Sequence, residues 1–319
     1  MSIMFARPRR LSRRFAMLSM MAMSCSEAPR PDFSSELDAA TELPAPEYLA
    51  LVSVTLTDDP NDESDSVDGS NAQVSALGTF LEYTGGSEHH VRLLSGIPER
   101  AAQRFSTGTC VRVDSLTRAL ASNGTLADPT EVMLLDVGNI YLETNEQKLP
   151  FDLVLVPDLP PVFAGVSYRQ RQTKLNVASP SPDGTFTALV HIDALSDSDL
   201  NAISEPVVFP PPLGLAVEYD EENAILRARW DGNSQSPMEL EIGFVDSAGE
   251  EVSVVCVIED NSMLSLPLRD LDALSLPPSP PILVTARRFA SSTRASGVFR
   301  DIDFEAIRTA TVALPPSLP

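Results

Sequence analysis

The chain has 319 residues and a formal net charge of -22. Such an acidic chain repels nucleic acid and anionic lipid headgroups, which excludes nucleic acid as a partner and electrostatic binding to a membrane. Its first 24 residues carry five arginines and no acid, so without them 295 residues remain at a net charge of -27, enough for two domains of ordinary size.

An export signal peptide is predicted at residues 1–24. Five arginines within 7–14 come first, and an uncharged apolar run follows from Phe15 to Ser24. The run has ten residues, whereas a membrane-spanning helix needs about 20. This length is typical of the apolar core of a signal peptide, so we expect residues 1–24 to be removed on export.

The residue after the predicted signal is Cys25. The segment Ala22-Met23-Ser24-Cys25 resembles a bacterial lipobox, with Ala22 where such motifs usually have leucine. The resemblance implies that Cys25 is acylated and anchors the chain in the lipid bilayer. Ser26, rather than an aspartate, follows the cysteine, which favours the outer membrane. Secretion or periplasmic release without lipid and a mitochondrial transit peptide stay open as alternatives.

Residues 25–47 are predicted to form a disordered, acidic tether behind the lipidated cysteine. Positions 26–47 contain six acids, one arginine and four prolines, without a periodic apolar pattern. Such a segment cannot bury enough apolar surface to fold. We therefore expect it to separate the membrane anchor from the first strand.

An N-terminal β-sandwich domain is predicted over residues 48–205. Short runs rich in β-branched and apolar residues alternate there with turns rich in Gly, Pro and Asp, which is typical of an all-β domain. The expected strands are 48–56, 76–83, 108–113, 131–136, 139–143, 149–156, 162–168 and 185–192. Short helical turns are expected at 97–104, 115–122 and 196–203.

The loop 57–70 between the first two expected strands is rich in acids, from Asp58 to Asp68. Counting back from Gly69, the positions that an EF-hand fills with acids fall on Ser64, Ser66 and Asp68. Two of the three are serines, so a solvated acidic loop is favoured over a calcium site.

A C-terminal immunoglobulin-like sandwich is predicted over 206–314, with a tail at 315–319. Four prolines, Pro206 and those at 210–212, indicate a stiff extended connector at its start. The expected strands are 213–219, 224–230, 239–245, 251–258, 263–267, 281–288 and 309–314. Seven short strands in about 100 residues fit such a sandwich. The predicted fold class is therefore all-β, with two β-sandwich domains.

The C-terminal domain resembles a fibronectin type III domain. The residues that carry the likeness are Leu215, Val217, Leu226, Trp230, Leu271 and 282–286. The likeness implies that Trp230 is the buried tryptophan of the second strand, whereas Ile282 stands where the family has a tyrosine. The order of the segments 134–139, 255–260 and 286–288 is also similar to that in a group of uncharacterised bacterial secreted lipoproteins. Those segments are structural and imply no activity.

Cys110 and Cys256 lie in expected strands of the two different predicted domains. An oxidising compartment permits a disulfide, but a bond between domains needs Cα atoms within about 7 Å. Two free, buried cysteines are therefore favoured over a disulfide. No Cys/His spacing indicates a zinc site.

No catalytic constellation is evident. Adjacent His89 and His90 would point to opposite sides of a strand, so a solvated loop is favoured over a metal site. His191 and Asp193 could share one strand face, but no nucleophile-elbow motif singles out a serine. Most aromatic residues, Trp230 among them, alternate at core spacing, whereas a carbohydrate platform needs several exposed on one face.

These patterns predict a non-catalytic cell-envelope lipoprotein without cofactor or metal. It would hold the bilayer through acylated Cys25 and bind an envelope protein partner through the edges or loops of its sandwiches. A glycan- or small-ligand-binding β-sandwich protein is the alternative, and a secreted hydrolase is a more distant third.

Overall fold

The computed structural model describes residues 45–58, 70–95, 97, 100–113, 131–159, 163–177, 181, 183–196, 200–232, 236–245, 249–274, 276 and 280–315. The predicted signal peptide 1–24, Cys25 and most of the predicted tether 25–47 lie outside these residues. So do most of the acidic loop Asp58–Asp68, the expected turn 115–122 and the end of the predicted tail 315–319. The described residues belong to one compact unit.

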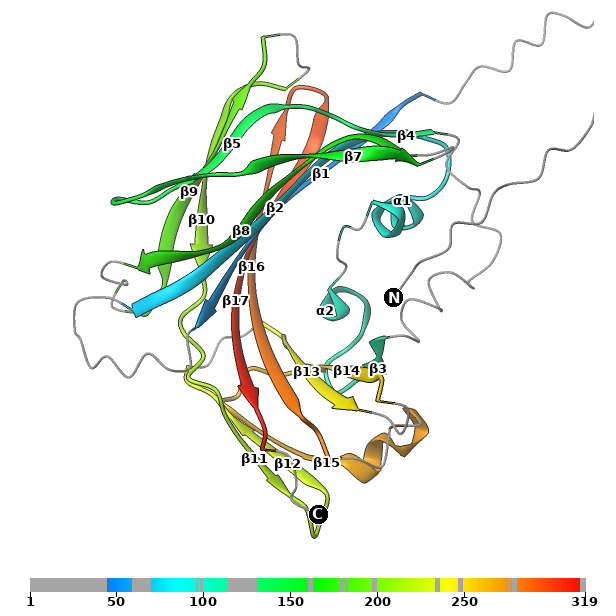
Figure 1. Ribbon diagram of the computed structural model, residues 1–319, viewed down its shortest axis with the longest axis vertical. Coiled ribbons are helices and arrows are strands. Elements are labelled where there is room, and N and C mark those ends of the chain that lie inside the picture. Colours follow the sequence, from blue (N-terminus) through cyan, green and yellow to red (C-terminus); the bar gives the residue numbers. More distant parts are fainter. Residues whose placement is uncertain are drawn as a thin grey trace, which may run out of the picture. The chain divides into compact units, whose positions relative to one another are not determined.

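This part of the chain is all-β, and its strands form three sheets (Figure 1). The ten-stranded sheet contains, in spatial order, β3 (Cys110–Arg112), β14 (Glu251–Ile258), β13 (Met238–Val245), β16 (Leu283–Ser296), β17 (Phe299–Ala313), β1 (Glu47–Asp58), β2 (Ser70–Thr84), β4 (Glu131–Leu134), β8 (Phe163–Val177) and β7 (Asp152–Leu159). The four-stranded sheet contains β10 (Ile203–Phe209), β9 (Phe186–Ala194), β5 (Gly138–Glu143) and β6 (Lys148–Pro150). The three-stranded sheet contains β11 (Ala216–Asp220), β12 (Ile225–Arg229) and β15 (Met263–Pro267). The described helices are short: α1 (Glu88–Leu94), α2 (Ala101–Arg104) and the 3-10 helix η1 (Leu268–Leu274).

The largest sheet takes strands from both predicted domains, 48–205 and 206–314. Strand β1 runs parallel to β17, with Val52 opposite Phe304. At the other end of the sheet, β3 pairs antiparallel with β14. The pairing of β1 with β17 is possible because β16 and β17 have 14 and 15 residues, well beyond the expected ranges 281–288 and 309–314. The boundary at residue 205 therefore does not separate two sheets.

Two hydrophobic cores lie against the same face of this sheet. The first core lies between it and the four-stranded sheet, and the second lies between it and the three-stranded sheet. Side chains alternate along a strand, so every second residue of β17 faces these cores. Phe304 and Ala306 belong to the first core, and Ala310 belongs to the second. Strands β11 to β17 surround the second core, with Trp230 buried as predicted.

Two arginines mark the border between the cores. Arg308 is the residue between Ala306 and Ala310 on the core face of β17, and Arg288 lies directly opposite it on β16. The two residues are only 1% and 2% exposed. Like charges directly opposite each other in a sheet repel, so each guanidinium needs a compensating anion.

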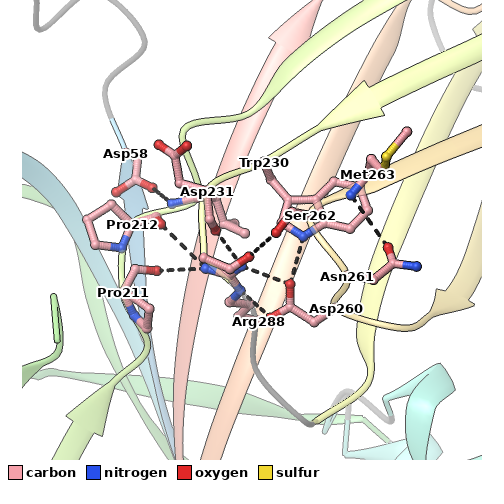
Figure 2. Close-up of polar contacts among 12 residues, drawn as sticks. Asp58, Pro211, Pro212, Trp230, Asp231, Asp260, Asn261, Ser262, Met263 and Arg288 are labelled. Atoms are coloured by element: carbon pink, nitrogen blue, oxygen red, sulfur yellow. Dashed lines mark hydrogen bonds and ion pairs between the residues drawn. The ribbon is translucent and has the colours of Figure 1, made fainter.

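Arg288 is compensated by Asp260, which lies between Arg288 and Trp230 in Figure 2. Arg288 Nε donates to Asp260 Oδ2 at 2.8 Å, and Arg288 Nη2 donates to Asp260 Oδ1 at 2.8 Å. Trp230 Nε1 donates to the same Oδ1 at 2.7 Å. Arg288 Nη2 also donates to the carbonyl of Asp231 at 2.5 Å. These bonds fix the loops after β12 and β14 to strand β16.

Arg308 is compensated by Asp58 at the end of β1, to which its Nη2 forms an ion pair. Asp58 Oδ2 also accepts the backbone N–H of Leu213, the first residue of the second core, at 3.2 Å. Arg288 Nη1 donates to the carbonyls of Pro211 and Pro212, both at 3.4 Å. The predicted proline connector is therefore held in place by the two arginines and their acids.

The opposite face of the large sheet carries α1 and α2. Val91 of α1 packs against Leu49, Leu51 and Leu81, and Ala101 packs against β14. After α2 the chain enters β3, where Cys110 lies directly opposite Cys256. The Cα atoms of the two residues are 4.0 Å apart, and a disulfide joins them. The preference for free cysteines was wrong, because it assumed that the two strands belong to separate domains.

Most expected strands are confirmed, and the differences have local causes. The expected strand 149–156 is interrupted at Phe151, where the chain leaves β6 in one sheet and enters β7 in another. His90 lies in helix α1 rather than in a loop. Ile203 begins strand β10 instead of ending a helical turn. Pro206 lies within β10, which tolerates it because β10 is an edge strand.

We predict that Arg288→Met lowers the free energy of unfolding by about 3–5 kcal/mol, because it leaves Asp260 buried without its cation. Arg294→Met on the same strand removes an exposed ion pair with Glu205 and should cost less than about 1 kcal/mol. Chemical denaturation of both variants measures the difference. Equal losses would contradict the structural role of the buried pair.

Candidate functional site

Strand β7 is the most exposed apolar element among the described residues. Leu153, Val154 and Leu155 are 48%, 37% and 75% exposed. β7 ends the ten-stranded sheet, and no other described strand pairs with its outer side. Consecutive apolar side chains and a row of unpaired backbone groups therefore face solvent together. An edge of this kind is a template for a further strand.

The exposed side chains continue the buried faces of the sheet. Leu153 lies opposite Tyr168 and Leu155 lies opposite Val166, and both partners belong to the first core. On the other face, Val156 packs against the cluster beneath α1. A strand added at this edge would therefore meet apolar side chains on both of its faces.

Both ends of the edge carry features that limit strand addition. Asp152 places a charge at the start of β7, and Pro157 lacks a backbone N–H near its end. The pairing with β8 is irregular between Val156 and Leu159. Charges, prolines and bulges are the usual protection of exposed edges. The unprotected part of β7 is therefore the segment 153–156.

Strand β8, the neighbour of β7, is basic. It contains Arg169, Arg171 and Lys174, all exposed, and no acidic residue. Asp152 of β7 lies opposite Arg169, so β7 begins there and residues 170–177 of β8 pair with β2 without a β7 neighbour. In a chain with a net charge of -22, this is a local concentration of positive charge.

A second candidate surface is the outer face of the four-stranded sheet. The rings of Tyr141 and His191 stack with centroids 4.7 Å apart, and Lys148 Nζ lies 3.3 Å from the centroid of Tyr141. His191 Nε2 is 3.1 Å from Glu143 Oε2. A shallow pocket of about 400 Å³ adjoins these residues and is lined by Asn139, Tyr141, Lys148 and Asp193 among others.

A larger open pocket of about 1220 Å³ lies where β1 begins. Tyr83 donates to Glu47 Oε2 at 2.6 Å, and burial together with this bond raises the pKa of Tyr83. Arg92 of α1 binds both Glu88, at 2.8 Å, and Asp303, at 3.2 Å. The polar groups of this pocket largely bind each other, which is typical of a structural junction.

Two carboxylates are buried on the face of the large sheet that carries the helices. Glu305 is held by Arg100 at 2.7 Å, and Glu239 accepts the backbone N–H of Ala102 at 3.0 Å. Burial raises the pKa of each carboxyl, neighbouring arginines oppose the shift at both, and the amides of Ala101 and Ala102 oppose it at Glu239. These acids position α2 and the segment before it against the sheet.

The described residues that the sequence indicates as site candidates lie in different parts of the fold and form no common site. His191 and Asp193 share the outer face of β9, but His191 contacts Glu143 and Tyr141, and no described hydrogen bond joins it to a serine. Of the acidic loop, the described Asp58 binds Arg308 and Leu213. Cys25 lies outside the described residues. Within the described chain, no group of three or more His, Cys, Asp or Glu side chains is arranged to hold a metal.

No family model matches the chain, and no curated protein matches it. Among solved structures, it is similar to the yeast delta-COP-I mu-homology domain, with 10% identity over 85% of this chain and 97% of that one. The TM-score is 0.23, so the likeness carries no argument about function. In the described residues, no helix has the length and apolar character needed to cross a membrane.

The raised pKa of Glu239 predicts a pH dependence of stability. The folded carboxyl keeps its proton above the usual pKa of 4.5, so its contribution to stability is present below that pH and is lost as the pH rises through the raised value. Glu239→Gln stays neutral and can still accept the Ala102 N–H. Its free energy of unfolding, relative to the unaltered protein, should therefore increase as the pH rises from 4.5.

Denaturant unfolding at a series of pH values measures this trend. Glu251→Gln, at an exposed position of β14, is the control and should change the free energy of unfolding by less than about 0.5 kcal/mol. A difference for Glu239→Gln that is independent of pH would contradict the raised pKa.

Proposed function

We propose that this protein is a non-catalytic lipoprotein of the cell envelope that binds a protein partner through the exposed edge of β7. The observation that carries the proposal is the unprotected apolar segment 153–156 at the end of the ten-stranded sheet. Natural proteins protect such edges unless they use them, because an exposed edge promotes aggregation. Strand addition to a free edge is a recurring mode of peptide recognition.

In this proposal the export signal directs the protein out of the cytoplasm, and acylated Cys25 anchors it in the outer membrane. The disulfide between Cys110 and Cys256 supports an oxidising compartment, because disulfides persist outside the cytoplasm. We also propose that the C-terminal region is a domain of the fibronectin type III kind, which its sequence resembles. This proposal is supported by the seven strands β11 to β17, which surround one core with Trp230 inside it.

The alternative function is binding of a glycan or another small ligand. The observation that favours it is the half-buried pair Tyr141 and His191 on the outer face of the four-stranded sheet, beside the pocket that Asn139 and Asp193 line. The pair is small, and Lys148 lies over the ring of Tyr141. The alternative therefore has less apolar surface to offer than β7.

We predict that Cys25→Ala releases the protein from the membrane fraction and removes the acyl mass from its mature N-terminus, because the other cysteines are joined to each other. Membrane fractionation and mass spectrometry of the mature N-terminus measure both effects. Ser26→Ala is the control and should remain acylated. Retention of Cys25→Ala in the membrane fraction would disprove the lipid anchor.

We also predict that a photo-crosslinking amino acid at Leu155 traps an envelope protein in living cells. The same amino acid at Met263, which is 59% exposed on an edge strand of another sheet, is the matched control and should trap little. Mass spectrometry of the crosslinked bands identifies the contact. Equal crosslinking from both positions would show that β7 is not the binding surface.

A further inference from the structure

We infer that the partner segment at β7 is an extended peptide in which apolar residues alternate along the strand and carboxylates follow. This inference rests on the proposed function, because it names the chemistry of the partner at the same edge. Three observations carry it: the unpaired backbone of β7, the apolar side chains on both of its faces, and the basic character of β8.

The unpaired backbone selects a peptide strand over a lipid surface. The outer N–H and C=O groups of β7 need hydrogen-bond partners, and burying them in hydrocarbon without partners would cost several kcal/mol each. A second strand supplies those partners at a spacing of about 4.8 Å. The exposed leucines are therefore better matched by a peptide than by an acyl layer.

The apolar part of the peptide follows from the register of β7. Leu153 and Leu155 point to the side of the first core, and Val154 points to the opposite side. Side chains of an added strand alternate in the same way, so its apolar residues would cover the two leucines from alternate positions. Binding would thus extend the first core by one strand.

The acidic part of the peptide follows from what lies beyond β7. A peptide that pairs antiparallel with β7 runs toward Asp152, so its C-terminal half continues past β7 and comes into the field of Arg171 and Lys174 on β8. Neither β8 nor the paired segment of β2, residues 70–78, contains an acid. A carboxylate there is attracted, whereas a lysine or arginine is repelled.

A second copy of this chain is a poorer occupant of the edge. A stable dimer needs about 1,200 Å² of buried surface in total, whereas a transient contact with a peptide segment can be smaller. Two chains that each carry a net charge of -22 also repel each other. The edge is therefore matched to a flexible segment of another protein, which needs only a strand's width of surface.

The test uses the full chain as isolated from cells and three synthetic peptides of about ten residues. Each peptide alternates valine and threonine in its first half, and the second half is glutamate, serine or lysine. Fluorescence anisotropy measures the affinity of each peptide. We expect the glutamate peptide to bind about tenfold more tightly than the serine peptide, and the lysine peptide to bind least. Added salt should remove the difference, because these charges are exposed.

Two variants and a control locate the binding. Leu155→Lys should weaken all three peptides at least about tenfold, because a charge at the centre of the edge opposes strand addition. Met263→Lys is the matched control on another edge strand and should have no effect. The double variant Arg171→Glu with Lys174→Glu should reverse the order of the glutamate and lysine peptides and leave the serine peptide unchanged.

The contrary outcomes separate the inference from the proposed function. Equal binding of the three peptides would overturn the acidic preference while β7 remains the binding edge. Binding that survives Leu155→Lys would overturn the use of β7 itself, and with it the proposed function. The inference would also be overturned if none of the peptides bound. It would be overturned if the protein bound anionic lipid vesicles, or formed a dimer in sedimentation, and Leu155→Lys abolished that binding or that dimer.

Discussion

The fold depends on two buried arginines that face each other across neighbouring strands. Arg288 and Arg308 occupy the core face of β16 and β17 at the point where one hydrophobic core ends and the other begins. Each requires its own carboxylate: Asp260 comes from the same C-terminal region as Arg288, whereas Asp58 comes from β1 in the N-terminal part of the chain. Arg288 is therefore neutralised within the second sandwich, whereas Arg308 is neutralised only when Asp58 of β1 reaches the border, which couples the second sandwich to the first.

This coupling explains why a chain with two sandwich cores has one large sheet. A first sandwich that ended at residue 209 would separate β1 from its parallel partner β17. A second sandwich that began at residue 213 would lack Asp58, the acid that neutralises Arg308. The disulfide between Cys110 and Cys256 adds a second connection, because it fixes the path of α1 and α2 to β14. The border between the cores is thus buried and held by ion pairs, whereas most domain boundaries are exposed linkers.

Local patterns in the sequence predicted much of the secondary structure but little of its assembly. Strand β12 and the burial of Trp230 followed from the alternation of Leu226, Ala228 and Trp230 with arginines, because this property is encoded within a few residues. The burial of Arg288 depends on Asp260, 28 residues away, and the pairing of β1 with β17 spans most of the chain. The exposed edge at β7 could not be predicted from the sequence for the same reason, because it depends on how distant segments pair. The expected strand 149–156 was correct in type, but its change of sheet at Phe151 decides which side faces solvent.

The edges of the three sheets differ in a way that supports a function for β7. β3 and β6 have only three residues, β10 contains Pro206, β11 carries Glu218 and Asp220, and β15 has five residues and ends at Pro267. These are the devices that keep an edge from pairing with another chain. In β7 the same devices stand only at the ends, at Asp152 and Pro157, and leave 153–156 open between them. Protection at both ends of β7 with an open apolar segment between them is the arrangement that a bound strand requires, and without a partner such an apolar edge would promote aggregation.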